Sequence, residues 1–267
     1  MDYQTATVQT NGFTMDYLRF GHGKETLVIL PGLSVQRVLP SAGAIVQAYR
    51  DLTDNFTNYL FERRNELPDP YPIQQMADDT YAAMQTLGLN DICLFGASQG
   101  GMIALTIACT YPSFVKKLIL GSTACRITDA QYAAIEHWVQ AAKNGETESL
   151  YLAFGEAIYP QELFRQYQRV LITMAKSVTE EDLRRFIVLA EAVRDFDVSD
   201  RLYEITCPVL ILGAKDDCVL GTDAASFLAN RMDGHAALEF HLYDGYGHAA
   251  YDTAPDYRTR MLQFLRK

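Results

Sequence analysis

The sequence has no apolar run near the roughly 20 residues that a membrane-spanning helix needs. Its apolar segments, such as Thr26–Leu30 and Val209–Leu212, have the length of strands. Basic residues are also fewer than acidic ones. The sequence has 23 Lys and Arg and 33 Asp and Glu, which gives a net charge of −10. That charge disfavours binding to nucleic acid or to an anionic membrane. Residues 1–12 lack the basic start and apolar core of a signal peptide. We therefore expect a cytoplasmic protein without a membrane span or a nucleic-acid partner.

The five cysteines include no C-x-x-C pair and are odd in number. Free, buried thiols in a reducing compartment are therefore expected, including Cys218 beside a predicted loop. No cluster of His, Cys and carboxylates has the spacing of metal ligands. No G-x-G-x-x-G follows a predicted strand, and no G-x-x-x-x-G-K-[ST] occurs. The sequence thus predicts neither a metal nor a nucleotide cofactor.

Short apolar segments alternate with amphipathic ones along most of the chain. Asn11-Gly12 is a hairpin turn within a β-prone start. Continuous apolar runs typical of strands buried on both faces cover Thr26–Leu30, Asn58–Glu62, Ile92–Phe95, Lys117–Leu120, Val209–Leu212 and Leu238–Tyr243. Helical patterns cover Ile73–Leu87, Gln99–Thr110, Ala224–Met232 and Pro255–Leu265. This alternation predicts an α/β fold with a doubly wound, mostly parallel sheet.

One stretch, from Asp129 to about Asp200, contains no convincing strand. It has four helical patterns: Asp129–Asn144, Thr147–Ile158, Pro160–Ser177 and Thr179–Ala192. A helical block between two strands cannot lie inside the sheet, so it should cover one end of it. We expect a core domain of residues 1–125 and 201–267, with residues 126–200 inserted as an all-helical cap.

The clearest local motif is Gly96-Ala97-Ser98-Gln99-Gly100-Gly101, which lies between a predicted strand and a predicted helix. A serine at such a tight turn needs small neighbours two residues away on both sides, and Gly96 and Gly100 meet that need. The turn lifts the hydroxyl above the sheet edge, and the N-terminus of the following helix favours negative charge. Ser98 is therefore a candidate nucleophile rather than a simple helix cap.

A serine nucleophile needs a base and an acid that orients the base. His248 follows the strand Leu238–Tyr243, in a loop where α/β proteins place their sites. Asp216 follows the strand Val209–Leu212, and its neighbour Asp217 is the alternative. The chain order Ser98, Asp216, His248 is the one found in hydrolases of this architecture.

These segments, together with Leu30-Pro31-Gly32-Leu33, resemble the α/β-hydrolase superfamily and specifically its cap-bearing members. The resemblance extends from Thr26 to the end of the chain. It implies that the acid is Asp216, which completes a "G-x-x-D" pattern, and that the backbone amides of Leu33 and Gln99 form the oxyanion hole. The chain departs from the pattern at Pro31, where many members carry a histidine. The glycine turn is kept, so a backbone donor at Leu33 is still expected.

The combined prediction is a carboxylesterase-like serine hydrolase that cleaves a small ester or related acyl bond. It would form an acyl-enzyme through Ser98, His248 and Asp216, without a cofactor. Other reactions occur on the same framework, so peptidase, lyase and C–C bond hydrolase activities stay open. A ligand sensor with little turnover is the alternative from another class. The expected partner is a small-molecule acyl substrate, and the expected state is a monomer or homodimer.

Overall fold

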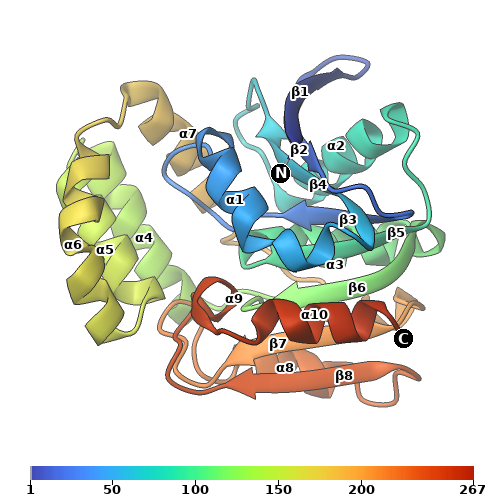
Figure 1. The fold of residues 1–267 in the computed structure, drawn as a ribbon. Helices are drawn as coiled ribbons and strands as arrows, with labels where there is room; N and C mark the ends of the chain where they lie inside the picture. Colours follow the sequence, from blue (N-terminus) through green and yellow to red (C-terminus); the bar gives the residue numbers. More distant parts are fainter. Residues whose placement is uncertain (1) are drawn as a thin grey trace.

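A computed structural model describes residues 2–267, and its centre is one eight-stranded sheet (Figure 1). The spatial order of the strands is β1-β2-β4-β3-β5-β6-β7-β8. Their bounds are β1 Tyr3–Gln9, β2 Thr14–Phe20, β3 Glu25–Leu30, β4 Phe56–Arg64, β5 Ile92–Ala97, β6 Val115–Gly121, β7 Val209–Ala214 and β8 Leu238–Tyr243. Strands β3 to β8 run parallel to one another. Strand β2 is antiparallel to both of its neighbours, β1 and β4, at one edge of the sheet. The predicted mostly parallel sheet is confirmed.

The hairpin at the N-terminal edge forms where the turn residues predicted it. Gln9 of β1 pairs with Thr14 of β2, and Gly12 between them has a φ of 112°. A glycine adopts such a positive φ without the steric cost that a side chain would bring. The hairpin therefore extends the parallel sheet without a crossover connection.

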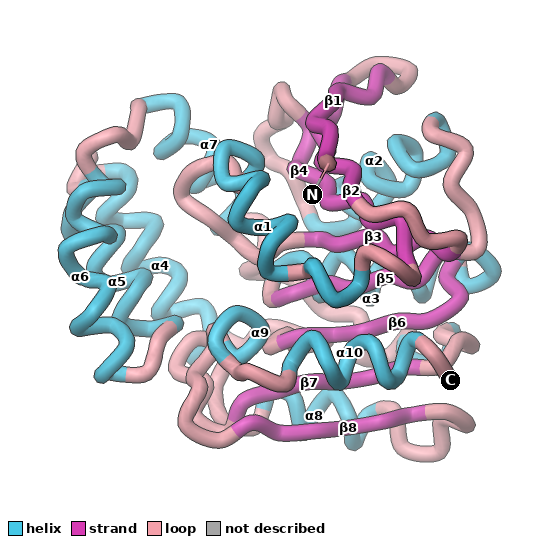
Figure 2. Tube along the Cα trace, in the orientation of Figure 1, coloured by secondary structure: helices cyan, strands magenta, loops and turns pink. Residues whose placement is uncertain are grey.

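Helices cover both faces of the sheet (Figure 2). Residues of α1 and α10 contribute to the core on one face, and residues of α2, α3 and α8 to the core on the other. The α-helices are α1 Ala42–Ala48, α2 Ile73–Thr86, α3 Gln99–Thr110, α4 Asp129–Lys143, α5 Thr147–Ile158, α6 Gln161–Ala175, α7 Glu180–Glu191, α8 Ala224–Arg231, α9 Ala250–Thr253 and α10 Tyr257–Leu265. The 3-10 turns are Leu39–Ser41, Arg50–Leu52, Pro112–Phe114 and Leu202–Glu204.

Burial of the strands follows their place in the sheet. Every residue of β5 and of β7 is buried, as continuous apolar runs between two helical layers require. The last strand, β8, is different, because it is an edge strand with mostly half-buried side chains and with Phe240 41 % exposed. The apolar run at Leu238–Tyr243 correctly predicted a strand, but that strand is not covered on both faces.

The four helices α4–α7, called the helical insertion below, lie between β6 and β7 in the chain. Thr128 and Thr179 each close a capping box at the start of α4 and α7, so two of these helices begin at side chains that satisfy free backbone amides. The insertion lies beyond the C-terminal ends of the parallel strands (Figure 1). Its position matches the predicted cover over one end of the sheet, while the division into separate domains stays a prediction.

Four of the five cysteines are buried, and all five are free. Cys218 is exposed, so the expectation that its thiol is buried was wrong. The loop after β7 turns its side chain outward while the next two residues, Val219 and Leu220, are buried. Within residues 2–267, no helix has both the length and the apolar character to cross a membrane.

Candidate active site

Ser98 stands at the turn between β5 and α3 in a backbone conformation that side chains rarely adopt, with φ 52° and ψ −121°. The turn is tight on both sides. A Cβ at Gly96 would lie 2.3 Å from the carbonyl oxygen of Gly100, and a Cβ at Gly100 would lie 2.0 Å from that of Leu30. No side chain fits at these distances. The small residues that the motif predicted are therefore a steric requirement of this turn.

Backbone and side-chain hydrogen bonds fix the strained serine to the neighbouring strand. The Ser98 amide donates to the carbonyl oxygen of Gly121 at 2.8 Å. The Thr123 hydroxyl donates to the Ser98 carbonyl oxygen, also at 2.8 Å. Both partners lie at or just after the end of β6, so the sheet holds the elbow from the side. Strain of this kind persists only where the surroundings fix the residue.

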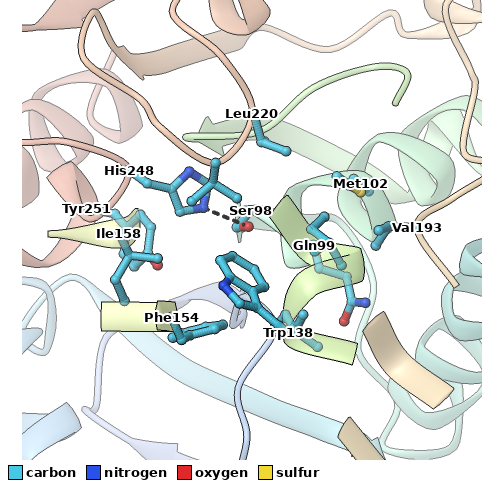
Figure 3. A pocket seen from close by; sticks show the side chains of 13 residues that line it. Ser98, Gln99, Met102, Trp138, Phe154, Ile158, Val193, Leu220, His248 and Tyr251 are labelled. Atoms are coloured by element: carbon cyan, nitrogen blue, oxygen red, sulfur yellow. Dashed lines mark hydrogen bonds between the residues drawn. The ribbon is translucent and has the colours of Figure 1, made fainter. Parts of the chain in front are cut away.

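The side chains of Ser98 and His248 meet above the sheet edge (Figure 3). Nε2 of His248 lies 2.9 Å from Oγ of Ser98, within hydrogen-bond distance. The imidazole is only 2 % exposed. The structure thus brings together the predicted nucleophile and the predicted base, which are 150 residues apart in the chain.

The acid that contacts the imidazole is Asp217, and this corrects the predicted Asp216. Oδ2 of Asp217 lies 2.8 Å from Nδ1 of His248. Asp216 accepts instead a hydrogen bond from the backbone amide of Gly247, at 2.9 Å. Consecutive side chains in the loop after β7 point in different directions, so only one of the two carboxylates reaches the ring. Asp216 therefore supports the backbone beside His248 rather than the imidazole.

Asp217 is held as a carboxylate. Its side chain is 4 % exposed, and burial alone would raise its pKa. The charge and hydrogen bond of His248, with the amides of Leu220 and Val219, outweigh burial and lower the pKa of Asp217 below its ordinary value. Those two amides donate to Oδ1 at 2.9 and 2.8 Å. An ionised Asp217 can accept a hydrogen bond from Nδ1–H of His248, which leaves Nε2 free to take the proton of the serine hydroxyl.

The two predicted oxyanion donors flank the same space. Gln99 is the first residue of α3, and Leu33 lies in the loop after β3. Both line a cavity with Ser98 and His248. The loop passes close to the elbow, since a Cβ at Gly32 would lie 3.2 Å from that of Ser98. This placement is compatible with the backbone role that the family resemblance implies, and that role stays a prediction.

The cavity beside Ser98 is small and mostly apolar. Its volume is about 20 Å³, close to the space of one water molecule. The other lining residues are Leu33, Gln99, Met102, Ile135, Trp138, Phe154, Ile158, Val193, Val219, Leu220 and Tyr251. The rings of Trp138 and Phe154 are 4.7 Å apart and close the side formed by the helical insertion (Figure 3). Ile135, Trp138, Phe154 and Ile158 belong to the helical insertion, and helical spacing in the sequence does not show which of its apolar residues line a cavity.

The His248 loop is also attached to the helical insertion. The amide of Ala249 donates to the carbonyl oxygen of Ile158 at 2.9 Å. Ile158 is the last residue of α5 and lines the cavity. The insertion therefore supplies both a wall of the cavity and a support for the loop that carries the imidazole. Among residues 2–267, no group of three or more His, Cys, Asp and Glu side chains is arranged to hold a metal ion.

Comparisons with known proteins agree with this architecture. A protein of Agrobacterium fabrum named "Putative carbamate hydrolase RutD" is 27 % identical over 226 residues, which are 80 % of this chain and 84 % of that protein. Among solved structures, MGS-M2, an α/β-hydrolase enzyme from a deep-sea metagenome library, has a TM-score of 0.86 at 18 % identity, covering 98 % of each chain. The enol-lactonase from Burkholderia xenovorans LB400 has a TM-score of 0.83 at 17 % identity, over 98 % of this chain and 100 % of the other.

These structural similarities confirm the α/β-hydrolase fold, which hosts many different reactions. The family of the chain follows from a comparison of its sequence with models of known protein families. The model described as "Serine aminopeptidase, S33" matches residues 71–252, which include Ser98, Asp217 and His248. This match spans more than half of the chain. The chain therefore belongs to the S33 family of hydrolases within the α/β-hydrolase superfamily.

Proposed function

We propose that this protein is a serine hydrolase that cleaves a small, neutral ester or related acyl bond through an acyl-enzyme. The observation that carries the proposal is the continuous hydrogen-bonded chain from Ser98 through His248 to Asp217, with distances of 2.9 and 2.8 Å. A buried base between a nucleophile and an ionised acid is the arrangement that activates a serine hydroxyl.

In the first half of the reaction, Oγ of Ser98 attacks the acyl carbon while His248 Nε2 takes the hydroxyl proton. The carbonyl oxygen becomes an oxyanion, and the amides of Leu33 and Gln99 donate to it. Collapse of this intermediate breaks the bond to the leaving group, which receives the proton from His248. Water then attacks the acyl-enzyme with His248 as base, and the acid product leaves while Ser98 regains its proton.

The cavity lining supports a neutral substrate. Apart from His248, no titratable side chain other than the Tyr251 phenol lines the cavity within residues 2–267. Placing a charge there would cost several kcal/mol without a partner. An aminopeptidase substrate carries an ammonium group near the scissile bond, and this cavity offers no carboxylate to pair with it. An uncharged ester, or a carbamate such as the name of the Agrobacterium relative suggests, fits the lining better.

The test uses a fluorophosphonate probe and two sets of neutral substrates, aryl esters and aryl carbamates. The wild-type chain should be labelled at Ser98 and should turn over many equivalents of at least one set. The Ser98→Ala variant should lose both labelling and turnover. Undiminished turnover by that variant would refute the assignment. A single stoichiometric burst of product from the wild type would instead favour the ligand sensor.

A further inference from the structure

A buried arginine, Arg63, connects the loop after β3 with the start of α3, the two segments that flank Ser98. Arg63 is at the end of β4 and is 4 % exposed. Its Nη2 donates to the carbonyl oxygen of Pro31 at 2.8 Å and to Oε1 of Gln99 at 3.2 Å. Pro31 begins the loop that contains Leu33, and Gln99 begins helix α3. One guanidinium nitrogen therefore touches both segments that hold the proposed oxyanion donors.

Arg63 remains a cation at neutral pH. Burial lowers its pKa to about 10, which is still well above neutrality. Its neighbour Glu62 is a buried anion that pairs with Arg185 of α7 at 3.3 Å. Glu62 also accepts from the amides of Val38 and Leu39 at 2.6 and 3.1 Å. The charges at the end of β4 thus hold the loop after β3 at a second point and attach it to the helical insertion.

The side chain of Gln99 makes two hydrogen bonds of its own, separate from the role proposed for the backbone amide. It points away from the Ser98 hydroxyl (Figure 3). Its Nε2 donates to the carbonyl oxygen of Leu189 in α7 at 2.6 Å, while its Oε1 accepts from Arg63. Gln99 is 2 % exposed, so both hydrogen bonds are shielded from water. The first turn of α3 is therefore fixed between β4 and the helical insertion.

We propose that Arg63 is a positioning residue that sets the geometry of the oxyanion hole by binding Pro31 and Gln99 with one guanidinium nitrogen. The Gln99 side chain extends this connection to α7, so the seating of the helical insertion and the position of the hole are coupled. Arg63 acts through these two residues and is not assigned a contact with substrate. The inference rests on the proposed function, because the hole matters only where an oxyanion forms.

The expected effect is selective for the transition state. The hole binds charge that develops during the reaction, so a displaced donor weakens the transition state more than the bound substrate. A misplacement of about 1 Å can reduce the rate by up to about 100-fold. Loss of the Arg63 contacts should therefore lower kcat and leave KM nearly unchanged.

The experiment compares Arg63→Met, Arg63→Lys and Gln99→Met with the wild type on a neutral aryl ester. Phosphonylation stoichiometry counts functional sites, so kcat is expressed per labelled site. Arg63→Met should lower kcat about 30-fold and change KM by less than about 2-fold. The affinity of an arylboronic acid, which forms a tetrahedral adduct, should fall in parallel with kcat. Arg63→Lys, which keeps the charge and one donor, should recover part of the rate.

Arg64→Met is the matched control, because Arg64 is adjacent to Arg63 in the chain but pairs with Asp79 instead of with Pro31 and Gln99. It should leave kcat and boronate affinity unchanged. If neither Arg63 variant folds, Gln99→Met decides, since it removes both side-chain contacts and keeps the backbone amide. A KM increase at constant kcat, an unchanged kcat, or an equal loss in Arg64→Met would overturn the inference. A wild-type chain that is neither labelled nor active would overturn the proposed function and, with it, this inference.

Discussion

Nδ1 of His248 is hydrogen-bonded to Oδ2 of Asp217 at 2.8 Å, and both side chains are almost fully buried. The adjacent carboxylate, Asp216, holds the backbone amide of Gly247 instead. The two consecutive aspartates therefore support the same histidine in different ways. Asp217 orients the ring, and Asp216 fixes the loop in front of it.

This division of roles predicts unequal effects of two identical substitutions. Asp217→Asn should lower kcat by about 10³- to 10⁴-fold, because an amide no longer favours the imidazole tautomer that accepts the serine proton. Asp216→Asn should cost less than about 10-fold, since its side-chain oxygen can still accept from Gly247. Steady-state kinetics on an aryl ester checks both values. Equal losses, or a larger loss at Asp216, would contradict the assignment.

The lowered pKa of Asp217 also predicts how stability changes with pH. A carboxyl group whose pKa is lower in the folded than in the unfolded chain binds its proton more readily when unfolded. Its stabilising contribution is complete above the ordinary Asp value of about 4 and is lost as pH falls through the folded pKa. The free energy of unfolding should therefore fall more steeply below about pH 4 in the wild type than in Asp217→Asn. Urea unfolding at several pH values tests this, and parallel curves would disprove it.

Much of this architecture could be predicted from local patterns. The apolar runs and glycine turns predicted the parallel strands, and the serine between Gly96 and Gly100 predicted the elbow. The position of His248 after a strand predicted that it would approach Ser98. These features depend on short segments whose chemistry and spacing limit the possible structures. The loss of alternation after Asp129 likewise predicted where the helical insertion begins.

Other features depend on side-chain directions that one sequence does not reveal. Asp216 and Asp217 have the same chemistry and adjacent positions, so only the course of the loop decides which one reaches His248. Arg63 lies in a strand whose sequence gives no sign of a functional role. Its hydrogen-bond partners are 32 and 36 positions away in the chain, so local patterns do not reveal them. The cavity lining depends on how the helical insertion is seated. The cytoplasmic location and the monomer or homodimer state stay predictions.

The strained backbone of Ser98 predicts that the protein is more stable with glycine than with alanine at this position. At φ 52° and ψ −121°, a residue with a Cβ is disfavoured by about 1 to 3 kcal/mol, and glycine is not. Ser98→Gly should therefore be more stable than Ser98→Ala by about 1 kcal/mol, and both should be inactive. Ser98→Ala is the control, because it removes the hydroxyl and keeps the Cβ. Equal unfolding midpoints for the two variants would show that the turn stores no such strain.

The small apolar cavity predicts a preference for short acyl chains that Trp138 enforces. Trp138 is 3 % exposed and lines the cavity, so Trp138→Leu should open space beside Ser98. One added methylene is worth about 10-fold or more in such a pocket. The ratio of kcat/KM for an aryl propionate over the acetate should rise by about 10-fold in this variant. Tyr132→Leu is the matched control, since Tyr132 is a 4 % exposed aromatic residue of the same helix that does not line the cavity. If the ratio stays at the wild-type value in Trp138→Leu, or rises equally in Tyr132→Leu, then acyl length is not selected by this wall.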